Sequence, residues 1–140
     1  MVIHSSGSQI SKQEIRAYVL QKRRTLLPEE KQRWDEALLE RLHPLFPSAG
    51  TAVYAYTSVR GCQEADAPKA LVITPGVGFS KDGNRIGYGA GYYDRFFAAE
   101  PDHMAVGLCY GFQLFPAFET EKHDKKMAYI VTPEQTIKVL

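Results

Sequence analysis

The sequence predicts an α/β fold, with a mainly parallel sheet flanked by helices in three α/β/α layers and a pair of helices at the N-terminus. Two helix-like segments open the chain, and short apolar runs then alternate with a further helix. These runs are apolar at almost every position, which is typical of strands covered on both faces. With 140 residues the chain has the size of one domain, 1–140, in which we expect residues 1–10 to be flexible.

The first two elements are predicted from capping signals. Ser11 followed by Glu14 fits a capping box and predicts a helix over about 12–24, in which Glu14 reaches back to the cap. Pro28 and the two acids after it are typical of a helix start, and Pro44 and Pro47 end that second helix. The apolar stripes should comprise Ile15, Tyr18, Val19 and Leu26 on the first helix and Trp34, Ala37, Leu38, Leu42 and Leu45 on the second.

The remaining chain predicts four strands and one helix. The strands are expected at 51–57, 70–75, 104–110 and 127–131, and the helix at 92–100, before Pro101. Residues 82–84, Asp-Gly-Asn, predict a turn. Residues 111–126 are expected to form a long loop, which is often functional in a compact domain.

Composition excludes several classes of protein. The net charge of +1 gives no global reason to expect a nucleic-acid partner, and no run is long enough to span a membrane. Cys62 and Cys109 are not in CxxC spacing, and Cys109 is expected to be a small core residue. The four histidines lack metal-ligand spacing. The absence of a signal-like N-terminus predicts a cytoplasmic protein.

The segment 85–94, Arg-Ile-Gly-Tyr-Gly-Ala-Gly-Tyr-Tyr-Asp, is the strongest functional signal. Gly87, Gly89 and Gly91 stand at every second position, where they would weaken a regular element but allow backbone N–H groups to face an anion. The dinucleotide fingerprint would require glycine at Tyr92, and no Walker A lysine follows. Spacing alone leaves a phosphate-binding loop and a tight structural turn about equally plausible.

The charged residues near this segment also admit two interpretations each. Asp94 either complements a helix dipole or binds Mg²⁺ beside phosphate. Arg85 is either a solvated turn residue or a phosphate clamp. Lys12 and Arg16 lie on one helix face, which spacing alone assigns to solvent, and with the basic residues 22–24 that face leaves a weak nucleic-acid interpretation open.

Taken together, residues 75–79 (PGVGF) and 82–96 (DGNRIGYGAGYYDRF) closely resemble the signature of the 5-formyltetrahydrofolate cyclo-ligase family. Lys12 and Arg16 before a Leu-Pro-Glu-Glu helix, Gln113, and the pair His123-Asp124 also resemble that family. The resemblance implies an enzyme in which ATP phosphorylates the formyl oxygen of 5-formyltetrahydrofolate, N10 attacks, and 5,10-methenyltetrahydrofolate forms as phosphate leaves. It implies the cofactors ATP and Mg²⁺, no nucleic-acid or membrane partner, and a monomer or homodimer.

The resemblance also implies roles for individual residues. Arg85 and Lys12 would be catalytic, and Asp94 would bind the metal. Thr57, Glu64 and Tyr92 would contact the folate. The ATP site would comprise Lys12, Arg16, Arg85, Gly87, Tyr88, Gly89, Ala90, Gly91, Tyr92 and Tyr93.

The chain departs from the family pattern in its middle. Several dozen residues that family members carry between the segment at Glu64 and the strand before Pro75 are absent, and Ala128 stands where some members place an aspartate. The alternative is therefore a non-catalytic remnant of the family that binds nucleotide or folate. A distant third possibility is a nucleic-acid-binding module that uses the first helix.

Overall fold

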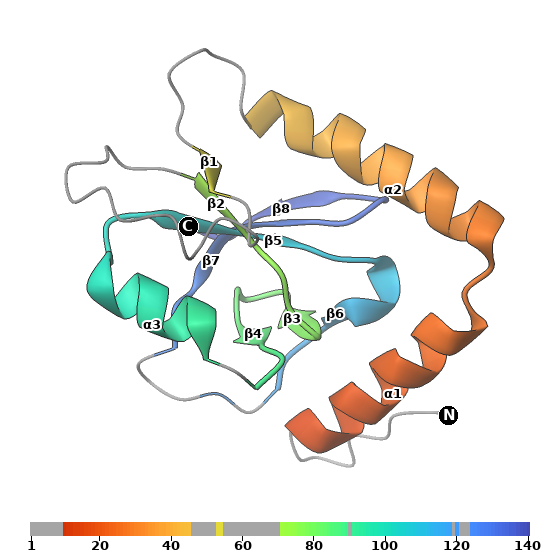
Figure 1. The fold of residues 1–140 in the computed structure, drawn as a ribbon, viewed down its shortest axis with the longest axis horizontal. Coiled ribbons are helices and arrows are strands. Elements are labelled where there is room, and N and C mark those ends of the chain that lie inside the picture. Colours follow the sequence, from red (N-terminus) through yellow and green to blue (C-terminus); the bar gives the residue numbers. More distant parts are fainter. Residues whose placement is uncertain (1–9, 46–52, 55–70, 90, 119, 121–123) are drawn as a thin grey trace.

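The computed structural model describes residues 10–45, 53–54, 71–89, 91–118, 120 and 124–140. A central sheet is covered on one face by helix α2 and on the other by helix α3, and helix α1 packs against a second, smaller sheet (Figure 1). The predicted α/β class with a largely parallel sheet, flanking helices and an N-terminal helical pair is confirmed.

The two N-terminal helices begin where their capping signals predict. Helix α1 spans Lys12–Thr25, and the hydroxyl of Ser11 accepts a hydrogen bond from the backbone N–H of Glu14 at 3.1 Å. The Glu14 carboxylate accepts from the Ser11 hydroxyl at 3.0 Å, instead of reaching the Ser11 backbone N–H. Helix α2 spans Pro28–Leu42 and continues into the short 3₁₀ helix η1, His43–Leu45.

The larger sheet has the strand order β1-β2-β5-β7-β8. Strands β1 (Val53–Tyr54), β2 (Leu71–Thr74), β5 (Met104–Leu108) and β7 (Met127–Val131) run parallel. Strand β8 (Thr136–Lys138), which the sequence analysis did not predict, pairs antiparallel with β7. Residues 53–54 pair parallel with 71–72, which joins the segments before and after residues 55–70.

Alternate residues of these strands serve two separate cores, as the period of two requires. Val72, Ala105 and Ile130 face α3 (Tyr92–Ala99) and its buried Phe96 and Phe97. The opposite face carries Ile73, Val106 and Val131 against the buried Leu38 and Leu42 of α2. Coverage on both faces explains why these strands are apolar at nearly every position.

The smaller sheet corrects the predicted long loop at 111–126. It has the order β4-β3-β6, formed by Arg85–Ile86, Gly78–Ser80 and Leu114–Phe115. The 3₁₀ helix η3, Gly111–Gln113, precedes β6, so the first part of the expected loop is regular structure. Strands this short carry too little periodicity to be read from the sequence. The predicted turn at 82–84 closes the β3–β4 hairpin, with Gly83 at φ 97°.

Phe79 joins the two sheets. Its fully buried side chain leaves β3 and lies against Gly107 of β5, where an added Cβ would be 2.5 Å from Phe79 Cε1. Gly76 is also close to this ring, because a Cβ there would lie 3.0 Å from Phe79 Cζ and equally close to Arg85 Cγ. Both glycines therefore serve close approach to one aromatic ring.

We expect Gly107→Ala to destabilise the protein by about 1–3 kcal/mol, because the new methyl group overlaps the Phe79 ring and interiors tolerate overpacking poorly. Urea unfolding followed by circular dichroism measures this change. In a Phe79→Leu background the same substitution should cost less, since the ring edge is gone. Equal costs in the two backgrounds would contradict this account of the contact.

Candidate functional site

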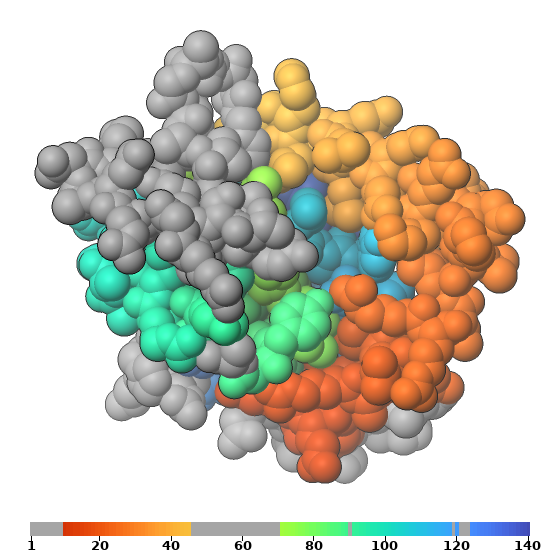
Figure 2. Space-filling model, in the orientation of Figure 1, coloured from red at the N-terminus to blue at the C-terminus, as the bar shows by residue number. Residues whose placement is uncertain are grey.

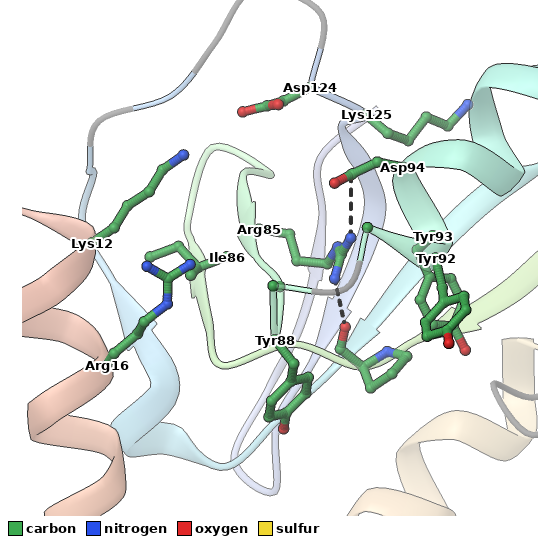
Figure 3. A pocket seen from close by; sticks show the side chains of 14 residues that line it. Lys12, Arg16, Arg85, Ile86, Tyr88, Tyr92, Tyr93, Asp94, Asp124 and Lys125 are labelled. Carbon is green, nitrogen blue, oxygen red and sulfur yellow. Dashed lines mark hydrogen bonds and ion pairs between the residues drawn. The ribbon is translucent and has the colours of Figure 1, made fainter.

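A cavity of about 600 Å³ opens beside Pro75, which follows the carboxyl end of β2 (Figure 3). Ligands of open α/β sheets bind at such strand ends. In Figure 2 the surface is hollowed between the red and orange N-terminal helices and the green segments of the chain. The cavity is lined by residues from α1, from β4, from the loop that carries Gly87, Gly89 and Gly91 (the glycine loop), from α3 and from the residues before β7. They are Lys12, Arg16, Pro75, Arg85, Ile86, Gly87, Tyr88, Gly89, Gly91, Tyr92, Tyr93, Asp94, Asp124 and Lys125.

The glycine loop presents open backbone to this cavity. Gly89 has φ 100° and Gly91 has φ 71°, so both adopt the left-handed conformation that side chains disfavour. Around Gly89 no atom of the described chain lies within 4 Å of where a Cβ would stand. Gly91 is the N-cap of α3, and its carbonyl accepts from the Arg95 N–H at 3.0 Å. The glycine loop therefore combines open space beside its backbone with the N-terminus of a helix, and this combination suits an anion.

Arg85 is a buried cation rather than a solvated turn residue. Its side chain is 9% exposed, its Nη1 donates to the Pro75 carbonyl at 3.0 Å, and its Nη2 lies 3.4 Å from Asp94 Oδ1. The guanidinium also stands over the Tyr93 ring, 5.6 Å from its centroid. Burial lowers the pKa of Arg85 from its usual value, an effect opposed first by the charge of Asp94. Arginine still keeps its proton at neutral pH, so the site holds a poorly solvated positive charge.

Two carboxylates lie at the top of the cavity in Figure 3. Asp94 stands in the first turn of α3 with its side chain 67% exposed, and Asp124 lies across from it. Within the described chain, no group of three or more His, Cys, Asp and Glu side chains could hold a metal by itself. A divalent ion here would need oxygen ligands from another molecule, as Mg²⁺ does when it binds with phosphate.

Helix α1 contributes two cations. The side chains of Lys12 and Arg16, one turn apart, both extend from α1 toward the cavity in Figure 3. The structure thus brings this pair to the glycine loop, although spacing alone assigned it to solvent. Lys125 contributes mainly its stem, because its Nζ donates to the Pro101 carbonyl at 3.0 Å.

The three tyrosines of the loop differ in environment. Tyr88 and Tyr92 are 64% and 50% exposed, so each offers an aromatic face at the cavity. Arg95 stands over the Tyr92 ring at 5.1 Å. Tyr93 is only 7% exposed and packs in the core beside Phe97, with its ring beneath Arg85. Tyr93 therefore supports the cation from below.

The predicted site residues that the structure describes converge on one cavity. Ala90, Thr57 and Glu64 lie outside the described residues. Pro75, Ile86 and Lys125 line the cavity without having been predicted, and Lys125 could have been suggested by its place after Asp124. Cys109 is 3% exposed, and burial raises its pKa to about 12, which leaves the thiol protonated and unreactive.

The fold and cavity define an α/β domain in which Lys12, Arg16 and Arg85 stand with the glycine loop around one cavity. The sequence profile of the 5-formyltetrahydrofolate cyclo-ligase family matches residues 62–133, about half of the chain. The chain therefore belongs to the 5-formyltetrahydrofolate cyclo-ligase family. None of the helices in its described part is long and apolar enough to cross a membrane.

Relatives support the same family. The 5-formyltetrahydrofolate cyclo-ligase of Saccharomyces cerevisiae is 41% identical over 76 residues, covering 48% of this chain and 35% of the relative. That of Mus musculus is 39% identical over 62 residues, covering 41% of this chain and 30% of the relative. The matches thus span about a third of each curated relative.

Solved structures show that the fold is shared across most of the chain. The 5,10-methenyltetrahydrofolate synthetase of Aquifex aeolicus superposes with a TM-score of 0.70 at 21% identity, covering 91% of this chain and 92% of that one. The Mycoplasma pneumoniae synthetase gives a TM-score of 0.70 at 22% identity, covering 87% and 98%. At such identity the likeness establishes the fold alone.

We expect the cavity to bind tripolyphosphate, with an affinity that falls as salt rises, because its ligand contacts are charges and backbone N–H groups. Lys12→Ala and Arg16→Ala should each weaken binding about tenfold or more, since a hydrogen bond to a charged group contributes about 1.5–3 kcal/mol. Isothermal titration calorimetry measures the affinities. Arg24→Ala, on the same helix but away from the cavity, is the matched control. Equal losses in all three variants would argue against a localised site.

Proposed function

We propose that this chain converts 5-formyltetrahydrofolate to 5,10-methenyltetrahydrofolate, with ATP and Mg²⁺, releasing ADP and phosphate. The observation that carries the proposal is the convergence of Lys12, Arg16, Arg85 and the glycine loop on one cavity that Asp94 borders. Two curated relatives are named 5-formyltetrahydrofolate cyclo-ligase, which supplies the reaction class.

A nucleotide triphosphate fits the chemistry of this cavity. Three cations face it, and backbone at Gly89 has room for close approach by phosphate oxygens. A volume of about 600 Å³ lies within the range of small-molecule and cofactor sites. Asp94 is the carboxylate that would hold Mg²⁺ alongside phosphate, because its exposed carboxylate can reach a ligand in the cavity.

The chain's own residues position charge rather than supply covalent chemistry. When bound, ATP would supply the phosphoryl group that makes the formyl oxygen a leaving group for ring closure by N10. Arg85 has one edge fixed on the Pro75 carbonyl, which leaves its Nη2 side available for phosphate. Lys12 adds a second charge from the opposite wall. Positioning and neutralisation of this kind are what phosphoryl transfer requires.

The ion pair between Arg85 and Asp94 is compatible with this use. Asp94 would hold the metal ion, and Arg85 Nη2, whose present contact with Asp94 is a long 3.4 Å, would then be available to phosphate. Metal binding and phosphate binding should therefore favour each other.

The folate side of the proposal relies on the exposed tyrosines. Tyr88 and Tyr92 offer flat aromatic faces, on which a planar heterocycle can stack. The contacts proposed for Thr57 and Glu64 concern residues outside the described ones. The single-domain extent, the cytoplasmic location, the monomeric or homodimeric state and the lack of a nucleic-acid partner stay predictions.

The activity is tested by incubating the purified chain with 5-formyltetrahydrofolate, ATP and Mg²⁺ and following methenyltetrahydrofolate by its near-ultraviolet absorbance. We expect an ATP-dependent signal that Arg85→Lys lowers by about a hundredfold to a thousandfold, as loss of one aligned transition-state donor does elsewhere. Arg24→Ala should retain the parent rate. A folded parent protein that gives no ATP-dependent signal would refute the enzymatic proposal.

The non-catalytic remnant predicts a different result. Such a chain would still be stabilised by Mg-ATP, by about 2.7 kcal/mol at a hundred times the dissociation constant, while producing no methenyltetrahydrofolate. Thermal unfolding with and without Mg-ATP separates the two. Unfolding temperatures that are unchanged at saturating nucleotide would exclude a nucleotide-binding remnant, and the same method with folate would then test a folate-binding one.

A further inference from the structure

Gln113 is a buried polar residue that lies outside the set lining the cavity. It ends the 3₁₀ helix η3 and is 2% exposed. Its Oε1 accepts from the backbone N–H of Tyr110 at 2.9 Å. Its Nε2 donates to two successive carbonyls, of Gly76 and of Val77, each at 3.1 Å. One side-chain amide thus joins the turn after β5 to the segment after β2.

The segment that Gln113 holds is the support of the cavity. The Pro75 carbonyl accepts from Arg85 Nη1 at 3.0 Å, and the Gly76 carbonyl accepts from the Tyr88 hydroxyl at 3.4 Å. The Val77 N–H donates to the carbonyl of Ile86, which itself lines the cavity, at 2.7 Å. Three consecutive residues therefore fix groups of β4 and the glycine loop.

The orientation of these peptide groups depends on the side-chain amide of Gln113, which donates to two of their carbonyls. Carbonyls in a segment with little regular pairing rotate unless each is satisfied, and buried ones are costly to leave unpaired. The two hydrogens of a primary amide match two neighbouring carbonyls, and the amide oxygen matches the Tyr110 N–H. A carboxylate has no donor for the carbonyls, and an apolar side chain satisfies none of the three groups.

We propose that Gln113 is a positioning residue for the cavity, which sets the angle of the Pro75–Gly76–Val77 backbone and through it the placement of Arg85 and Tyr88. Its effect on turnover rests on the proposed function, whereas its effect on the backbone does not. Displacement of a phosphate-binding group by about 1 Å costs about a hundredfold in rate, so a hydrogen-bond pair remote from the ligand can govern activity.

The test compares Gln113→Met, similar in length but without donors, with Thr132→Val. Thr132 is 1% exposed, and its hydroxyl accepts from the N–H groups of Glu134 and Gln135 in a turn away from the cavity. It therefore controls for loss of a buried polar group. If Gln113→Met fails to fold, Gln113→Glu, which keeps the acceptor for Tyr110, replaces it.

Hydrogen exchange of the ligand-free proteins gives the first result, independently of any nucleotide. Exchange rates are first corrected for the change in global stability of each variant. We then expect Gln113→Met to increase the exchange rates at residues 76–79 and 85–89 about tenfold more than Thr132→Val does. Faster exchange confined to residues 110–114 would overturn the proposal. Failure of the parent chain to bind Mg-ATP would refute the proposed function, but the exchange rates would still decide whether Gln113 positions this backbone.

A double-mutant cycle gives the second result. Gln113→Met should weaken Mg-ATP binding about tenfold in the parent and much less in an Arg85→Lys background, because its effect passes through Arg85. When Gln113→Met is combined with Lys12→Ala, which lies on another element, the losses of Mg-ATP affinity should add. Additive losses with both partners, or an unchanged affinity in the folded Gln113→Met protein, would overturn the positioning role.

Discussion

The placement of the site depends on how closely β3 approaches the larger sheet, and Phe79 sets that approach. Its ring is held between Gly76 and Gly107, at both of which a Cβ would lie within 3.0 Å of the ring. Phe79 is also paired in register with Arg85 of β4. The ring therefore fixes the distance between the two sheets. Through the pairing of β3 with β4 it also fixes the position from which the buried guanidinium of Arg85 reaches the Pro75 carbonyl.

Burying a cation beside an open cavity has an electrostatic consequence. Arg85 loses much of its hydration, which lowers its pKa, and it forms an ion pair with the exposed Asp94 at 3.4 Å. A poorly solvated charge with a distant counter-ion gains more from an incoming anion than a fully hydrated lysine does. The cost of keeping Arg85 buried is partly offset by the Pro75 carbonyl and the Tyr93 ring. This electrostatic balance is what the proposed binding of phosphate in the cavity requires.

Local signals predicted the fold well where they were strong. Ser11, Pro28 and the apolar runs at 70–75, 104–110 and 127–131 placed both N-terminal helices and three strands within about two residues. The second sheet was missed, because β3, β4 and β6 have only two or three residues each and β6 joins β3 through a pairing distant in the sequence. The same limit applies to Lys12 and Arg16: their spacing gives a helix face, and only tertiary packing turns that face to the glycine loop.

The cavity consequently has a rigid side and an adjustable side. Arg85 donates to the Pro75 carbonyl, and Gln113 donates to the next two carbonyls, of Gly76 and Val77, so little ordering would be needed if an anion bound there. Tyr88, Tyr92 and Asp94 are half-exposed or more and must lose side-chain freedom on binding. Under the proposed function, the ordering costs would fall on the exposed side, so the phosphate end of the ligand would be bound first and most firmly. The aromatic side would then close on the heterocycle, so that the rigid half would govern affinity and the exposed half would govern selectivity.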